Sequence, residues 1–257
     1  MGKELKQLES HDPQFEFIFL SREDLPIHHF ELVRNFFKGY HPQYLINCAA
    51  YTAVDRAETE KDLAFQVNGE AVGVLAAVCK EYGTKFLHVS TDYVFDGTAS
   101  APYKEDAATN PQSVYGASKL EGEKEALHFN TETIVIRTSW VYSEYGRNFV
   151  KTMIKLMNEK EQLYVVNDQI GSPTYAADLA DAIMQIISSG KWSPGIYHYS
   201  NEGVISWFDF AVAIRDLTGS TCKVTAIPTT SYPTPAKRPV YSVLDKSKIA
   251  GTYGISL

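Results

Sequence analysis

The sequence predicts an α/β protein with a doubly wound parallel sheet and a second, smaller lobe of mixed α/β structure. Two observations lead to this prediction. Up to Arg137, apolar β-rich runs alternate with helical stretches, which is the order of parallel strands joined by crossover helices. After Trp140 the alternation loosens, and shorter elements lead into a proline-bearing stretch over residues 227–239. This change indicates a second lobe that covers the strand ends.

Each predicted element rests on the period of its apolar residues. The larger lobe is expected to hold residues 1–142 and 160–192, and the smaller lobe residues 143–159 and 193–257. Strands are predicted over 15–20, 44–49, 85–90, 133–137, 163–166 and 197–199, and helices over 30–37, 62–82, 113–127, 148–157, 175–187 and 207–217.

Composition excludes several classes of protein. The chain has 257 residues and a net charge of −7, and without a run of Lys and Arg it is not expected to bind nucleic acid. No apolar run of about 18 residues stands out, so no membrane span is expected. Three widely spaced cysteines suggest neither a disulfide framework nor a zinc site, and favour a cytoplasmic location.

Thr91, Tyr115 and Lys119 form a candidate proton-donating site. Thr91 ends a predicted buried strand, and ligands gather at the carboxyl ends of strands in open α/β sheets. Tyr115 and Lys119 are four residues apart on a predicted helix, so both project from one face. A Lys ammonium beside the phenol oxygen would lower the pKa of Tyr115. The set fits the reduction of a carbonyl, with Tyr115 protonating its oxygen and Thr91 hydrogen-bonding it.

Seven segments in order carry a resemblance to a known family. The chain resembles the extended short-chain dehydrogenases and, within them, the dTDP-4-dehydrorhamnose reductases. The matching segments are INCAAYTAVD at 46–55, STDYVFDG at 90–97, YGASK at 115–119, RTSWVY at 137–142, NFV at 148–150, DQIGSPTY at 168–175 and RPVYSVLD at 238–245. The resemblance implies a Rossmann-like fold and reduction of the 4-keto group of dTDP-6-deoxy-L-lyxo-4-hexulose to dTDP-L-rhamnose, with hydride from NAD(P)H.

The resemblance also implies roles for single residues. The larger lobe would bind the dinucleotide and the smaller lobe the dTDP-sugar. Asn68 matches an Asn of the wider superfamily, and small residues at 49–50 would let backbone approach a ligand. Thr91, Tyr115 and Lys119 match the catalytic triad; the cofactor positions are Gly2, Arg22, Ala49, Ala50, Tyr51, Ser90, Tyr115 and Lys119, and the substrate positions are Val54, Thr91, Tyr93, Trp140, Asn148 and Arg238.

Two regions depart from the family pattern. The family opens with a strand and a G-x-x-G-x-x-G loop, whereas here Gly2 matches the last glycine of that loop. We therefore expect a sequence trimmed at both ends, with unpaired strand edges where the first strand would lie. Pro26 stands where an Asp is common near the adenine. Arg22 favours binding of the 2′-phosphate of NADPH, whereas Glu23 and Asp24 favour the 2′-hydroxyl of NADH. We expect a slight preference for NADPH.

Other functions remain open at this point. One relative of these reductases is a non-catalytic regulatory subunit of methionine adenosyltransferase, and sugar-nucleotide epimerases and dehydratases share the Tyr and Lys pair. Trp140 and the segment 168–175 favour the reductase. Some family members use Mg²⁺ at a dimer interface, but no ligand cluster can be read from the spacing. No metal ligand is therefore predicted, and a homodimer stays an open expectation.

Overall fold

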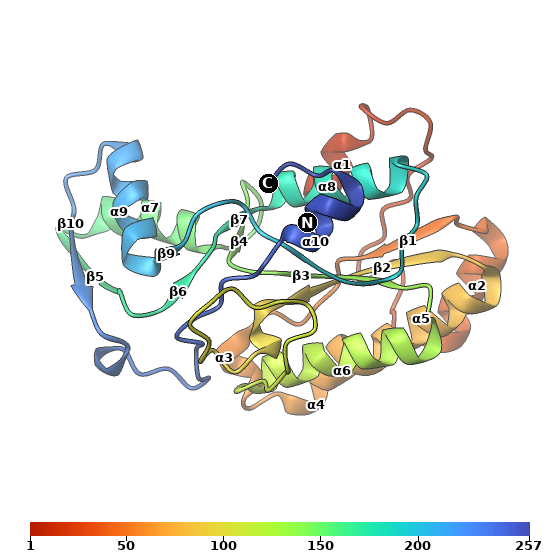
Figure 1. Cartoon of the computed structure of the whole chain (residues 1–257), viewed down its shortest axis with the longest axis horizontal. Coiled ribbons are helices and arrows are strands. Elements are labelled where there is room, and N and C mark those ends of the chain that lie inside the picture. The colour runs from red at the N-terminus through yellow and green to blue at the C-terminus, as the bar shows by residue number, and fades with distance from the viewer.

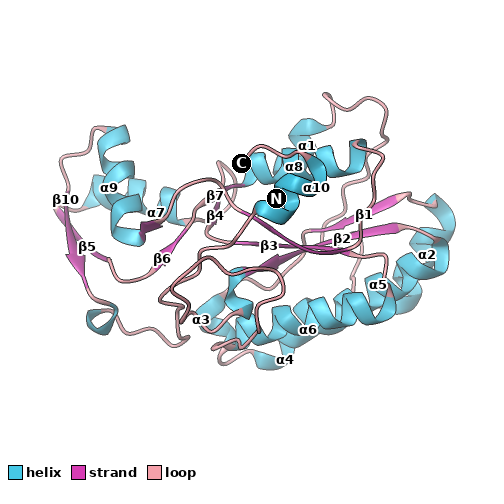
Figure 2. Ribbon diagram, viewed as in Figure 1, coloured by secondary structure: helices cyan, strands magenta, loops and turns pink.

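A four-stranded parallel sheet forms the centre of the larger lobe. The computed structural model describes residues 1–257, and the sheet has the strand order β1-β2-β3-β8. Every neighbouring pair in it is parallel, which confirms the predicted fold class. Figure 2 shows these strands side by side between helices. The strands are β1 Tyr44–Asn47, β2 Lys85–Thr91, β3 Ile134–Thr138 and β8 Gly195–Tyr199.

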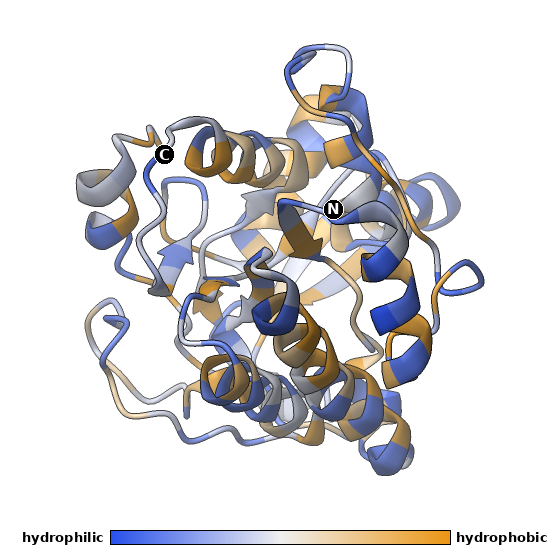
Figure 3. Cartoon of the chain, turned by 90° about the vertical axis from the view of Figure 1, so that its right-hand side faces the viewer, coloured by the Kyte–Doolittle hydropathy of each residue, from blue (hydrophilic) through white to orange (hydrophobic).

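Helices cover both faces of this sheet (Figures 1 and 3). Successive residues of β2 point to opposite faces: Phe86 packs with the helices of one core cluster and Leu87 with those of the other. One face carries α2 Phe30–Tyr40, α4 Lys61–Phe65, the π-helical turn Gln66–Glu70, α5 Ala71–Tyr82 and α6 Val114–Phe129; the other carries α1 Gly2–Leu8, α8 Ala176–Ser188 and α10 Ser247–Tyr253.

The smaller lobe lies at one end of the molecule (Figure 1). Its strands β5 Gln162–Val166 and β10 Lys223–Ile227 pair in parallel. They share an apolar core with α7 Phe149–Glu159 and α9 Trp207–Thr218. Two short strand pairs join the lobes, namely β4 Val141–Tyr142 with β7 Thr174–Tyr175 and β6 Ile170–Gly171 with β9 Ile205–Ser206.

Strand pairing differs from the predicted lobe boundaries in two places. The segment 160–192 was expected in the larger lobe, yet β5 pairs with β10 of the smaller lobe. The segment 193–257 was expected in the smaller lobe, yet β8 pairs with β3 and α10 packs against β8. The reason is that pairing is non-local: a short apolar strand carries no sign of which sheet it joins.

The predicted strand over 15–20 is wrong. This segment belongs to no strand. Phe15 packs edge-on against Tyr44 of β1, with ring centroids 6.1 Å apart, and the alternate aromatic residues contribute to the core. β1 is hydrogen-bonded to β2 alone and forms one end of the sheet. The segment therefore packs as a strand does without a hydrogen-bonding neighbour.

The helical stretch Lys61–Tyr82 meets the length and apolarity of a membrane-crossing helix, with a mean hydropathy of 1.2. Sequence inspection found no such run. The apolar window of 18 residues within it is 56% buried inside the protein, where α5 packs along α6 and α2. The core position accounts for its apolar composition.

Candidate active site

Tyr115 lies beside Thr91 because the first turn of α6 packs on the backbone that follows β2. Ser113 starts the helix by accepting a hydrogen bond from the Gly116 amide at 3.1 Å. A Cβ on Gly116 would lie 2.2 Å from the Tyr93 carbonyl oxygen, so only glycine permits this approach. The Tyr115 and Tyr93 rings meet edge-on with centroids 5.4 Å apart.

The hydroxyl of Tyr115 is a weak acid in this structure. Burial raises the pKa of Tyr115 to about 12, and a hydrogen bond with the Thr91 side chain acts in the opposite direction. The sequence predicted a lowered value from a neighbouring Lys119 ammonium. That prediction is wrong for this structure, because the Lys119 amine is hydrogen-bonded elsewhere. Tyr115 therefore holds its proton until a stronger base than water is placed beside it.

Lys119 is almost fully buried, with 2% of its surface exposed. Its Nζ donates to the Val89 carbonyl at 2.7 Å and lies 3.2 Å from Nε2 of His88. Burial lowers the pKa of Lys119 to about 8, while the charge of Glu123 opposes this. The predicted common helix face is confirmed, but the amine turns to β2.

Asp92 directs the hydroxyl of Thr91. The Thr91 Oγ donates to Asp92 Oδ1 at 3.0 Å and accepts from the Tyr93 amide at 3.3 Å. Asp92 is buried, and its other carboxylate oxygen has no hydrogen-bond partner. Burial raises the pKa of Asp92 to about 6. Sequence reasoning missed this residue, although it stands directly after Thr91.

The loop Ala49–Tyr51 follows β1 and is held by two buried asparagines. The Ala49 amide donates to Asn47 Oδ1 at 3.0 Å. Asn68 clamps Tyr51 from both sides, accepting from its amide at 2.8 Å and donating to its carbonyl at 3.0 Å. Asn68 lies in the π-helical turn, a geometry frequent at functional sites. Ala49 is exposed, so a small, fixed loop at the strand ends faces outward, which fits a nucleotide.

Three predicted cofactor residues lie in other surroundings. Ser90 donates to Glu123 Oε1 at 2.5 Å and so belongs to the buried pair of Glu123 and Arg137. Gly2 begins α1, where a Cβ would meet no atom within 4 Å, so the fold does not require glycine there. Arg22 is exposed in the turn after the 15–20 segment and makes no hydrogen bond or ion pair.

Arg238 and Val54 lie near each other at the short helix α3 Val54–Ala57, because Arg238 bonds Asp55. Val54 begins this helix. Arg238 Nη2 donates to Asp55 Oδ2 at 2.7 Å, and Asp55 also accepts from the Ala236 amide at 3.2 Å. Burial acts to raise the pKa of Asp55, but these hydrogen bonds hold it below its usual value. Asp55 was missed, although it lies in the matching segment 46–55.

Trp140 and Asn148 lie at the junction with the smaller lobe. Trp140 has a positive φ of 49° and stacks on Trp207 with centroids 3.6 Å apart, a strained backbone of the kind that clusters at binding sites. A capping box of Ser206 and Asp209 fixes the start of α9 and with it Trp207. Asn148 caps α7 by accepting from the Lys151 amide at 3.0 Å, so its side chain has a structural role.

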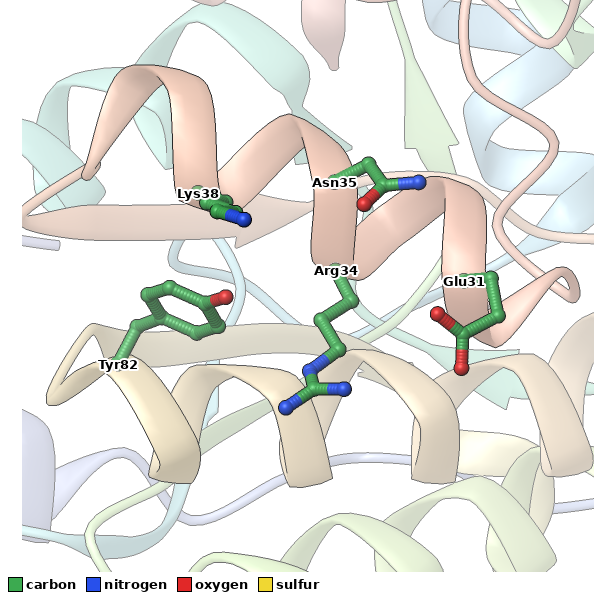
Figure 4. A pocket seen from close by; sticks show the side chains of 5 residues that line it. All are labelled: Glu31, Arg34, Asn35, Lys38 and Tyr82. Carbon is green, nitrogen blue, oxygen red and sulfur yellow. The ribbon is translucent and has the colours of Figure 1, made fainter.

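A shallow pocket elsewhere is unrelated to these residues. Figure 4 shows it between α2 and α5, lined by Glu31, Arg34, Asn35, Lys38 and Tyr82. Arg34 donates from Nε to Glu81 at 2.8 Å across it. No group of three or more His, Cys, Asp or Glu side chains lies close enough to hold a metal ion.

Comparison with known proteins identifies the family. The model of the RmlD substrate binding domain matches residues 1–257. A dTDP-4-dehydrorhamnose reductase of Aggregatibacter actinomycetemcomitans is 42% identical over 99% of this chain and 90% of its own length. The structure of a dTDP-4-dehydrorhamnose reductase from Clostridium acetobutylicum matches with a TM-score of 0.93 and 42% identity, over 98% of this chain and 89% of that one.

A dTDP-4-dehydrorhamnose reductase from Bacillus anthracis, solved in complex with NADP, matches with a TM-score of 0.92 and 38% identity, over 96% of this chain and 88% of its own. Both the matches along the sequence and the matches in space extend over both lobes. The chain therefore belongs to the dTDP-4-dehydrorhamnose reductase family.

Proposed function

We propose that this chain reduces the 4-keto group of dTDP-6-deoxy-L-lyxo-4-hexulose to give dTDP-L-rhamnose, with Tyr115 as the proton donor. The observation that carries the proposal is the close seating of α6 on the Tyr93 backbone, which holds Tyr115 near Thr91 at the carboxyl end of β2. The developing alkoxide at C4 is a far stronger base than water, so it can take the Tyr115 proton despite a pKa of about 12. Thr91 supplies a second hydroxyl for the same oxygen.

NADPH is the proposed cofactor, and when bound it supplies the hydride. The Ala49–Tyr51 loop would lie along the cofactor, and Lys119 would contact the hydroxyls of its nicotinamide ribose. Support comes from the rigid, outward-facing loop and from the relative solved with NADP. Arg22 is exposed and unpaired, so it is free to contact a 2′-phosphate, and the preference over NADH rests on that residue.

We assign the substrate contacts to the surface between the lobes. Tyr93, Val54 and Arg238 would hold the nucleotide sugar from the larger-lobe side, and Trp140 would face it from the junction. Arg238 suits the pyrophosphate because its planar fork pairs with phosphate oxygens. Asn148 would act through the start of α7, which it caps. A cytoplasmic location fits an enzyme that uses NADPH and a dTDP-sugar. Size-exclusion chromatography with light scattering would measure whether the chain forms a homodimer.

The test is oxidation of NADPH followed with dTDP-6-deoxy-L-lyxo-4-hexulose. Tyr115→Phe should lower kcat by about 10²–10⁴-fold, the usual contribution of general acid catalysis, and leave the dissociation constant of NADPH within about twofold. Tyr164→Phe is the matched control, because Tyr164 is 59% exposed and forms no side-chain hydrogen bond. Unchanged turnover of Tyr115→Phe would remove Tyr115 as the acid. No turnover by the parent chain would favour a binding subunit.

A further inference from the structure

His88 lies directly beneath Lys119 and is completely buried on β2. Its two ring nitrogens have different neighbours. Nδ1 lies 3.1 Å from Asn47 Nδ2, and Nε2 lies 3.2 Å from Lys119 Nζ. Burial, followed by the charge of Lys119, lowers the pKa of His88 well below its ordinary value. The ring is therefore neutral and carries one N–H.

Asn47 determines which ring nitrogen carries that proton. The Ala49 amide donates to Asn47 Oδ1 at 3.0 Å, which fixes the amide with its Nδ2 toward His88. An amide NH₂ group is only a donor, so Nδ1 of His88 must accept. In a neutral ring the proton then sits on Nε2. A backbone amide of the Ala49–Tyr51 loop thus sets the tautomer of a buried histidine.

The Nε2 proton points at Lys119. An ammonium group has three donors and no acceptor, so an ammonium at 3.2 Å from an N–H would place two donors face to face. A neutral amine accepts the Nε2–H bond through its lone pair and still donates to the Val89 carbonyl at 2.7 Å. Both contacts of Lys119 are satisfied only in the uncharged form.

We propose that His88, with its proton held on Nε2 by Asn47, is a positioning residue that favours the neutral amine form of Lys119 next to β2 until cofactor binds. The part that concerns cofactor rests on the proposed function. The tautomer of His88 and the charge of Lys119 are properties of the free chain. Because Asn47 also holds the Ala49 amide, a ligand that moves the cofactor loop acts on Lys119 through this pair.

The other ionisable groups near Lys119 do not replace this control. Cys48 follows β1, and burial raises its pKa to about 11, so it stays a neutral thiol. Glu123 lies one turn along α6 and is paired with Arg137 at 2.7 Å. Tyr115 lies one turn back and also keeps its proton. His88 is the group in hydrogen-bond contact with the amine.

The test changes Asn47→Asp. A carboxylate still accepts from the Ala49 amide but also accepts from His88 Nδ1, which moves the ring proton to Nδ1 and leaves Nε2 as an acceptor for an ammonium. The midpoint of Lys119 titration, followed by NMR of ¹³Cε-labelled lysine and assigned with Lys119→Arg, should rise by at least one pH unit. The carboxylate of Asn47→Asp could also raise the Lys119 midpoint by its charge alone. The same substitution in the His88→Phe background measures that effect, and there we expect less than half of the rise in the Lys119 midpoint.

One measurement needs no variant. The ¹⁵N chemical shifts of His88 in the parent chain should show protonated Nε2 and unprotonated Nδ1. A proton on Nδ1, or an equal rise of the Lys119 midpoint in both backgrounds, would overturn the proposal. These readouts use no substrate, so they can fail while the reductase reaction holds. They can equally succeed in a chain that reduces nothing.

Discussion

The carbonyl oxygen of Tyr93 lies 2.2 Å from the place where a Cβ on Gly116 would stand. The helix that carries Tyr115 and Lys119 is therefore seated directly on the backbone that carries Thr91. No side chain separates the two, so the relative position of Thr91 and Tyr115 is fixed by backbone packing rather than by an adjustable contact.

Gly116→Ala should displace the start of α6 and with it Tyr115. We expect a loss in kcat on the order of 10²-fold, because a shift of about 1 Å at a reacting group has that effect, and a destabilisation of about 1–3 kcal/mol from overpacking. Gly251→Ala is the control, since Gly251 lies in α10 with no atom within 4 Å of its added Cβ. Enzyme kinetics and urea unfolding of both variants check the prediction. Equal behaviour of the two would show that α6 can move freely.

Glu123 and Arg137 form a buried pair in which the loss of one partner should destabilise the fold strongly. Arg137 Nη2 and Nε donate to Glu123 at 2.7 and 2.9 Å, and both side chains are almost completely buried. Arg137→Met leaves a buried carboxylate unpaired and should cost about 3–5 kcal/mol, whereas replacing both residues by Met should cost less than the sum of the single changes. Urea unfolding of the parent chain, the two single variants and the double variant measures the coupling energy between Glu123 and Arg137. If the two single changes added up to the double change, the two residues would not be coupled.

An exposed ion pair offers the comparison. Arg34 and Glu81 are joined at 2.8 Å, with side chains 46% and 37% exposed. Arg34→Met should change the free energy of unfolding by no more than about 1 kcal/mol. A loss as large as that of Arg137→Met would mean that burial is not the cause of the difference.

The sequence was sufficient for the elements whose pattern is local. The strand before Thr91 and the helix from Ser113 were placed within two residues, since a buried apolar run and a serine cap are both visible in the sequence. The 15–20 segment has the same alternation, yet it forms no ladder, because hydrogen bonds need a neighbouring strand. Alternation reports which side chains are buried, and not whether the backbone is paired.

The partner of Lys119 lay beyond what spacing can predict. The i, i+4 rule correctly put Tyr115 and Lys119 on one helix face, but a long side chain chooses its partner in three dimensions. His88 and Asn47 come from two different strands, paired directly as Asn47 opposite His88. Only the register of β1 on β2 brings them together beneath the helix. The family segment at 46–55 contains Asn47, but nothing in its sequence indicates which residue of β2 lies opposite.

Asp92 should make stability depend on pH near neutrality. Burial raises the pKa of Asp92 from 3.8 to about 6, so the folded state binds this proton more tightly than the unfolded chain. The resulting stabilisation is complete below pH 3.8 and is lost as the pH rises through 6. Relative to Asp92→Asn, the parent chain should lose about 2 kcal/mol between pH 4 and pH 7. Urea unfolding at both pH values measures this difference, and Asp106→Asn controls for the loss of a carboxylate at an exposed site.

Arg238 should change partner during binding, from Asp55 to the pyrophosphate of the substrate. Its bond to Asp55 joins residues 183 positions apart and holds the 227–239 stretch against α3. Arg238→Ala should raise KM for the dTDP-sugar by about 10–100-fold, because a charge-assisted hydrogen bond contributes about 1.5–3 kcal/mol. The value of kcat should fall by less than about threefold, since the contact proposed for Arg238 is with the pyrophosphate and not with the reacting carbonyl.

Lys237→Ala is the matched control for Arg238→Ala. It removes one positive charge from the neighbouring position, where Lys237 Nζ reaches only Gln112 at 3.3 Å. If long-range attraction of the anionic substrate were the cause, both variants would raise KM equally, and the difference from the parent chain would shrink with added salt. A specific exchange at Arg238 instead leaves Lys237→Ala near the parent value and persists at high salt. Asp55→Asn separates the two partners, because it releases Arg238 without removing its charge and should leave KM the same or lower.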